Sequence, residues 1–318
     1  MFAYFATGKF TFPLEWFLRD WAPQLVAQVQ VVPYESLFDF RSLGGTAILS
    51  DWDRLHADER TTYSRWFAER GQGRLLNPPG GVPERETLNA RLREAAYCNF
   101  RVMPAQALPA DLRFPVFLRA RNDHRGSLTP LLHDHAALTD ALEVVMQWTR
   151  PSDLLVCEWL RCTAPFDAGL YCKFSAMRID RHLIPRHVLF ARHWQVKHPD
   201  RINPELAAYE REWMETFPER DAVNRVFDLA GVDYGRIDYG FDAAGQMQVF
   251  EINTNPMVMP KRDSVAPLRL DAQLASATRM IEAFQELAGE SSDRPARQGF
   301  PRWVRARLRG PVRPRNRA

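Results

Sequence analysis

The segment from Gly235 to Pro256 constrains the fold of this chain most, because it has the pattern of a β-hairpin. Residues 236–241 and 246–252 form two short stretches of alternating character, which is typical of strands. Between them lies a turn, Asp242 to Gly245, whose glycine can adopt the positive φ that a hairpin needs. The sequence therefore predicts two antiparallel strands near the C-terminal end of the folded chain.

The hairpin gathers acidic and amide side chains. Arg236 and Asp238 share a face of the first strand, because side chains two residues apart point the same way. Glu251 and Asn253 share a face of the second strand for the same reason. A matched register brings Asp238 close to Glu251 and Asn253. Two carboxylates and an amide oxygen suit Mg²⁺, which takes hard oxygen ligands.

The same alternation fits an amphipathic hairpin whose charged face lies in water, and spacing alone supports both interpretations equally. Two details favour the metal site. Phe250 and Ile252 indicate that the second strand packs on a core. The run from Asn253 to Pro256 stays polar where a strand should turn away.

The order of residues here also resembles a known signature. The run Arg-Ile-Asp, a turn, and the run Val-Phe-Glu-Ile-Asn-Thr-Asn-Pro resemble the C-terminal signature of the ATP-grasp superfamily, which includes D-alanyl-D-alanine ligases and glutathione synthetases. The resemblance implies that Asp238, Glu251 and Asn253 hold the Mg²⁺ ions of ATP, with Mn²⁺ as an alternative metal. It also implies that Arg236 acts in catalysis by facing the reacting phosphoryl or acyl group.

Composition divides the chain into two parts. The formal net charge is +3, but the stretch from Arg294 to Arg317 holds nine arginines and no acid, which leaves 33 basic against 39 acidic residues elsewhere. We expect a mildly acidic body and a basic, disordered tail at 291–318. Contact of the tail with an anionic surface is an alternative, and no nucleic-acid motif is present.

Cysteine usage and hydropathy indicate a cytoplasmic protein. The four cysteines lack Cys-x-x-Cys spacing, which favours reduced thiols. No apolar run approaches the roughly 18 residues of a membrane span, and the first residues lack the pattern of a signal peptide.

Residues 1–80 have the pattern of a small α/β unit, and the alternation of strands with helices favours a parallel sheet. The expected strands are 2–6, 29–32, 46–50 and 74–76, and the expected helices are 13–27 and 60–70. Asp51 and Asp53 follow the third strand, at the edge where open α/β sheets bind ligands. We expect them to cap the next helix rather than to contact substrate.

Residues 84–160 are expected to form a central lobe. In ATP-grasp enzymes a strand like Pro115 to Arg119 carries a lysine onto the phosphates, and here Arg119 takes its place. Arginine keeps the charge and can bind phosphate through two parallel hydrogen bonds, but its planar head changes the geometry. The resemblance also implies that the backbone near Glu158 and Leu160 binds the edge of adenine. His124 follows the strand, and we expect it to be a loop histidine rather than a zinc ligand.

Residues 161–290 are expected to form the C-terminal lobe that contains the metal site. Beside the hairpin described above, the expected elements are strands 171–179 and 182–190 and helices 204–216, 221–230 and 268–288. Lys173 lies on the first of these strands, and Lys197 lies in a loop that resembles the mobile flap of the family. The resemblance implies that both lysines reach the phosphates of ATP.

The combined expectation is an α/β chain, α+β in its nucleotide lobes, with the ATP-grasp fold and an N-terminal parallel-sheet domain. The resemblance implies an ADP-forming carboxylate ligase that passes through an acyl phosphate and uses a small-molecule carboxylate and a nucleophile. One alternative is an ATP-grasp kinase that phosphorylates a hydroxyl. Another is a nucleotide-binding protein without ligase activity, which the replacement of lysine by Arg119 favours and the complete set of metal ligands opposes.

Overall fold

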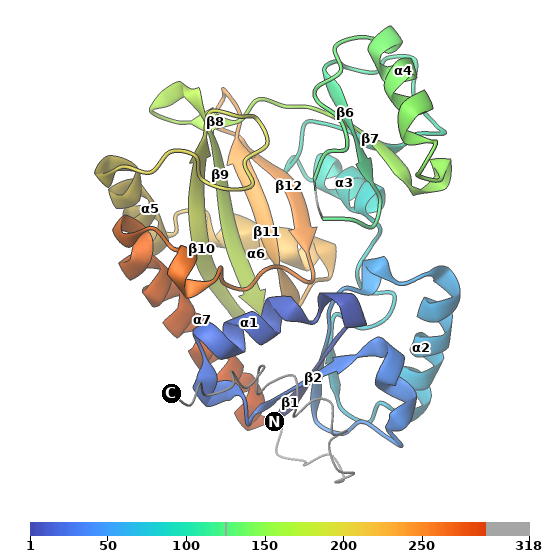
Figure 1. Ribbon diagram of the computed structural model, residues 1–318, viewed down its shortest axis with the longest axis vertical. Helices are drawn as coiled ribbons and strands as arrows, with labels where there is room; N and C mark the ends of the chain where they lie inside the picture. Colours follow the sequence, from blue (N-terminus) through green and yellow to red (C-terminus); the bar gives the residue numbers. More distant parts are fainter. Residues whose placement is uncertain (125, 291–318) are drawn as a thin grey trace, which may run out of the picture.

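The computed structural model describes residues 1–124 and 126–290, which form three sheets with flanking helices (Figure 1). The N-terminal sheet is parallel, with strand order β2-β1-β3-β4, as the sequence predicts. Its elements are β1 (Phe2–Ala6), α1 (Phe12–Asp20), β2 (Val29–Pro33), β3 (Thr46–Leu49), α2 (Ala57–Arg70) and β4 (Arg74–Leu76).

Helix α1 is shorter than the helix predicted over residues 13–27. It ends at Asp20, and Pro23–Leu25 forms a short 3-10 turn instead. A proline disfavours the helical conformation of the residue before it, so the helix stops although apolar side chains continue to Leu25.

The central lobe contains an antiparallel sheet of three strands in the order β5-β7-β6. Its elements are α3 (Arg85–Glu94), β5 (Val102–Pro104), β6 (Val116–Ala120), α4 (His135–Val145) and β7 (Leu154–Glu158). The apolar residues of β7 alternate between two cores, because successive strand residues point to opposite faces. Leu154 and Val156 pack with α4, whereas Leu155 and Cys157 pack in the core that includes α3.

The C-terminal lobe contains an antiparallel sheet in the order β10-β9-β11-β12, with β8 paired to β9. Its strands are β8 (Thr163–Ala164), β9 (Asp167–Ile179), β10 (His182–Ala191), β11 (Tyr234–Phe241) and β12 (Met247–Asn253). Its helices are α5 (Pro204–Thr216), α6 (Arg220–Ala230) and α7 (Leu270–Glu290). The turn between β11 and β12 contains Gly245 with a φ of 74°, which confirms the predicted hairpin.

Helix α7 joins the N-terminal unit to the C-terminal lobe. Phe284 of α7 stacks on Phe2 with ring centroids 5.7 Å apart, inside a core that also contains residues of β9 and β11. Asn77, which follows β4, donates to the carbonyl of Tyr234 at 2.7 Å and accepts from the amide of Asp233 at 2.8 Å. These contacts hold the parallel sheet beside the large antiparallel sheet (Figure 1).

Within residues 1–124 and 126–290, no helix is both long and apolar enough to cross a membrane. The predicted basic tail at 291–318 lies outside the described residues.

Candidate active site

The register of the C-terminal hairpin brings the proposed metal ligands together. β11 and β12 pair so that Asp238 lies opposite Glu251 and Arg236 lies opposite Asn253. Asp238 and Asn253 are buried, and Glu251 is half-buried. Three oxygen-bearing side chains therefore occupy neighbouring positions at one end of the hairpin, and a β-bulge between Asp238 and Tyr239 produces this register.

Asp238 is surrounded by hydrogen-bond donors of the same sheet. Its Oδ1 accepts from Ser175 Oγ at 2.7 Å and from Arg236 Nε at 2.8 Å, and its Oδ2 accepts from Lys173 Nζ at 3.0 Å. Burial alone would raise the pKa of Asp238, but the charges of Arg236 and Lys173 outweigh burial and hold that pKa below its usual value. Asp238 is therefore a carboxylate at neutral pH.

Glu251 is bound by cations from the central lobe. Its Oε2 accepts from Arg85 Nη1 at 2.7 Å and from Arg119 Nη2 at 2.9 Å, and His124 Nδ1 lies 3.9 Å away. Burial would raise the pKa of Glu251, but the charge of Arg119, with His124 and Arg85, lowers it well below its usual value. Arg119, at the place of the expected lysine, thus links β6 to β12.

A cleft lies between the central and C-terminal sheets. Four of the five residues predicted to contact the nucleotide line it, namely Arg119, Glu158, Leu160 and Lys173. Much of the remaining wall is aromatic, with Phe117, Trp159, Tyr171, Trp194 and Phe250 among the lining residues. The cleft is therefore charged at one part of its wall and apolar at another.

The fifth predicted residue, Lys197, lies beside the loop that follows β6. A Cβ added at Gly126 would clash with the Lys197 side chain, and the φ of +101° at Gly126 favours glycine there. Burial lowers the pKa of Lys197, and Glu251 lies near enough to oppose this effect. Lys197 is thus within electrostatic range of the carboxylate that Arg119 binds.

Glu158 and Leu160 contribute to the cleft in different ways. The buried Glu158 carboxylate accepts from backbone and guanidinium groups of Arg101 and Arg113 at 2.5 to 3.2 Å. Burial raises the pKa of Glu158, but these bonds lower it to about 2. The Glu158 amide already donates to the carbonyl of Arg101, whereas the Leu160 amide has no partner among the described residues. Leu160 is therefore the better-placed backbone donor for a ligand.

Asp51 and Asp53 do not cap helix α2, so that expectation is wrong. The N-cap of α2 is His56, and Glu59 completes its capping box. Asp51 instead accepts a hydrogen bond from Thr7 Oγ1 at 2.5 Å. The side chains of Asp51 and Asp53 therefore bond to Thr7 and to His124 rather than to helix α2.

The sequence did not identify Arg85 or the pairing of Asp53 with His124 as parts of the site. Asp53 Oδ2 lies 2.9 Å from His124 Nε2 although the two residues are 71 positions apart. Arg85 Nη2 approaches the other ring nitrogen of His124 at 3.3 Å. No local pattern marks the contact between Asp53 and His124. The one available signal for Arg85 is its place two residues after the segment 77–83, which is rich in proline and glycine.

The arrangement of the sheets decides the fold. A small antiparallel sheet carrying Arg119 and a large antiparallel sheet carrying Asp238 and Glu251 enclose one cleft, and a parallel-sheet unit packs beside them. The chain therefore has the α/β architecture expected from the sequence, with one parallel and two antiparallel sheets among the described residues. No family model matches the sequence, and the search of curated proteins gave no match. Among solved structures, the search matched a RimK domain protein ATP-grasp from Sphaerobacter thermophilus DSM 20745, at 12% sequence identity and a TM-score of 0.48, covering 92% of this chain and 100% of that chain.

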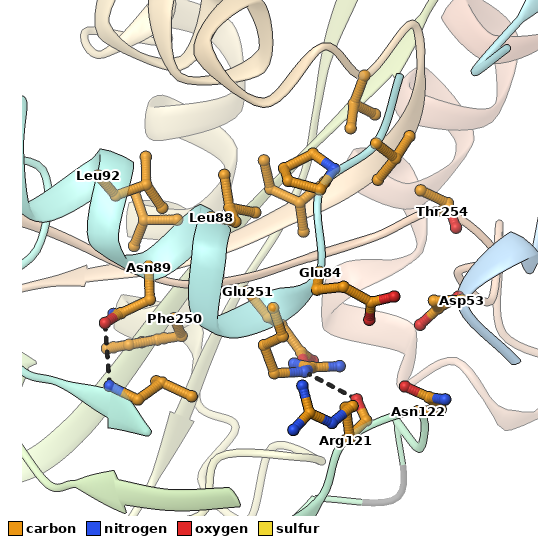
Figure 2. Close-up of a pocket in the computed structure, with 17 residues that line it drawn as sticks. Asp53, Glu84, Leu88, Asn89, Leu92, Arg121, Asn122, Phe250, Glu251 and Thr254 are labelled. Carbon is orange, nitrogen blue, oxygen red and sulfur yellow. Dashed lines mark hydrogen bonds and ion pairs between the residues drawn. The ribbon is translucent and has the colours of Figure 1, made fainter. Parts of the chain in front are cut away.

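The protein contains a second cavity next to the first (Figure 2). Val102 and Phe250 line both cavities, so a single layer of side chains separates them. The second cavity also contains Glu251 and Arg85 in its wall. It therefore adjoins the carboxylate end of the candidate active site.

Proposed function

We propose that this protein is an ADP-forming, ATP-dependent carboxylate ligase that binds MgATP in the cleft between its two antiparallel sheets. One observation carries the proposal: two carboxylates, Asp238 and Glu251, lie opposite each other and are each bound by cations that line the same cleft. Opposed acidic and basic groups are what a metal-bound triphosphate requires, because the metal needs anionic ligands and the phosphates need cations.

The ligand set fits Mg²⁺. Asp238, Glu251 and Asn253 offer hard oxygen atoms, which Mg²⁺ prefers and Mn²⁺ also accepts. In the part of the chain that the structure describes, no group of three or more His, Cys, Asp or Glu side chains provides a competing metal site. When bound, Mg²⁺ supplies positive charge that offsets the charge of the triphosphate.

The basic side chains have a role before and after the nucleotide arrives. Without phosphate, Arg119 and Lys173 are held by the carboxylates of Glu251 and Asp238. Phosphate oxygens offer these cations alternative partners, so Arg119 and Lys173 would bind the phosphates, with Lys197 joining from the neighbouring loop. Arg236 would steady the acyl phosphate and the anion that forms during attack by the nucleophile.

The aromatic part of the cleft suits a nucleobase. Phe117 and Trp194 have ring centroids 5.2 Å apart and both line the cleft. Flat aromatic walls stack on the face of a base, while the Leu160 amide can donate to its edge. Trp194 precedes Lys197 in the same loop, so closure of this loop over the nucleotide would exclude water from the reacting groups.

The reaction can be tested with hydroxylamine, which traps acyl phosphates as hydroxamates. We expect that, with MgATP and a panel of small carboxylates, one carboxylate will stimulate ADP release and yield its hydroxamate. A stable phosphorylated alcohol would indicate a kinase instead. Binding of ATP without any product across carboxylates and alcohols would indicate a nucleotide-binding protein, and either result would contradict the ligase.

A further inference from the structure

The second cavity has two chemically different ends (Figure 2). One end is apolar and is lined by Leu88 and Leu92 of α3 together with Val102 of β5. The other end is polar and is formed where three parts of the chain meet, with Asp53, Glu84, Asn122 and Thr254 in the wall. A ligand that fills the cavity would therefore need an apolar body and a polar head.

The polar end contains two buried oxygen atoms without hydrogen-bond partners. Asp53 Oδ1 and Asn122 Oδ1 are both shielded from solvent, and neither has a partner among the described residues. A buried acceptor left unpaired costs about 1–3 kcal/mol, and more when it is charged. Two such atoms in the wall of one cavity are candidate acceptors for a donor from outside the described chain.

The nearby cations of the described chain are already engaged. Arg54 binds Asp51, Arg85 binds Glu251, and Arg121 binds Glu86. Burial would raise the pKa of Asp53, but the neighbouring charge of His124, with those of Arg85 and Arg54, lowers it to about 2. Asp53 is therefore an anion that keeps one oxygen unpaired, because His124 occupies only its Oδ2.

We propose that the second cavity binds a primary ammonium group at Asp53 Oδ1 and Asn122 Oδ1, with the apolar body of the same molecule against Leu88 and Leu92. An ammonium group has three donors and one positive charge, so it can satisfy a carboxylate and an amide oxygen together. The subsite rests on the proposed ligase function and assigns its nucleophile to the class of primary amines with an apolar carbon skeleton.

The position of the subsite suits an acceptor substrate. A single imidazole spans the distance from Asp53 to Glu251, one of the proposed metal ligands: His124 Nε2 lies 2.9 Å from Asp53, and its Nδ1 lies 3.9 Å from Glu251. The cavity is separated from the nucleotide cleft by the layer that contains Phe250. An amine held at Asp53 is thus next to the reacting end of the cleft but outside the space that the nucleotide needs.

The test uses two probes that differ only in the ammonium group: L-leucinamide and 4-methylpentanamide, titrated calorimetrically into the full chain without nucleotide. We expect L-leucinamide to bind at least about tenfold more tightly, because only it carries a charged donor. Asp53→Asn and Asn122→Ala are each expected to weaken its binding by about tenfold or more. Asp58→Asn, the same chemical change at an exposed position of α2, should leave the affinity unchanged.

Equal affinity of the two probes for the natural protein would overturn the subsite, as would unchanged L-leucinamide affinity in both cavity variants. Asn122→Ala keeps the test decisive if Asp53→Asn disturbs folding, because Asn122 Oδ1 has no bond to lose within the described chain. Affinity for a non-hydrolysable ATP analogue is measured on the same samples. If the wild-type protein does not bind the ATP analogue, only the proposed function is contradicted. If it binds L-leucinamide and 4-methylpentanamide equally well, only the amine subsite is contradicted.

Discussion

Replacing Glu251 with glutamine is expected to lower MgATP-dependent ADP release by about a hundredfold or more. Glutamine keeps the size of the side chain but removes the charge that Mg²⁺ needs, and even changes to groups behind metal ligands cost about 10- to 100-fold. The measurement is the rate of ADP release at saturating MgATP. Glu94→Gln, at an exposed position of α3, serves as the matched control and should retain the natural rate.

Glu251→Gln has a second expected effect, on stability. Arg85 and Arg119 would lose the anion that they share, and both guanidinium groups are largely buried. The variant should therefore unfold at a lower temperature in the absence of nucleotide. If a folded Glu251→Gln protein releases ADP at the wild-type rate, Glu251 is not a metal ligand.

Glu158→Gln is expected to reduce the free energy of unfolding by about 3 kcal/mol, because it leaves the cation of Arg101 without its buried partner. The Glu158 side chain is 2% exposed, and Arg101 and Arg113 both bind it. Denaturant unfolding would measure the loss. Asp111→Asn is a matched control, since Asp111 also pairs with Arg101 but is 80% exposed; this variant should keep nearly the wild-type stability, because solvent screens an exposed ion pair.

The effect of Glu158 also has a predicted pH dependence. The folded chain lowers the pKa of Glu158 from 4.5 to about 2, so its contribution is complete above pH 4.5 and disappears as the pH falls toward 2. The difference in stability between the natural protein and Glu158→Gln should shrink across this range. If the difference in unfolding free energy between the two proteins stays constant over the roughly 3 pH units from pH 5 to pH 2, the charge of the Glu158 carboxylate is not the cause of the stabilisation.

The existence of the hairpin could be predicted from the sequence because the alternation of β11 and β12 and the Gly245 turn are local signals. The exact register could not, because a β-bulge between Asp238 and Tyr239 shifts the pairing by one residue and so places Asp238 opposite Glu251. The predicted end of the first helix was wrong for a local reason too. Apolar spacing continues to Leu25, but Pro23 ends the helix before that residue.

Contacts between distant segments could not be predicted in the same way. Glu158 meets Arg101 and Arg113 across 57 and 45 residues, and nothing in its own segment distinguishes this buried ion-pair role from a backbone role in the hinge. The contact between Asp53 and His124 likewise depends on how the N-terminal unit packs against the central lobe. Such pairs appear only when the sheets are placed in space.

The central claim, a metal-dependent nucleotide site at Asp238 and Glu251, is tested most directly by equilibrium binding of a non-hydrolysable ATP analogue with Mg²⁺ and with EDTA. We predict saturable binding in Mg²⁺ and a loss of at least about tenfold in affinity with EDTA, because the carboxylates and the triphosphate repel each other without the metal. Equal affinity under both conditions, or no binding in Mg²⁺, would contradict the assignment of these residues.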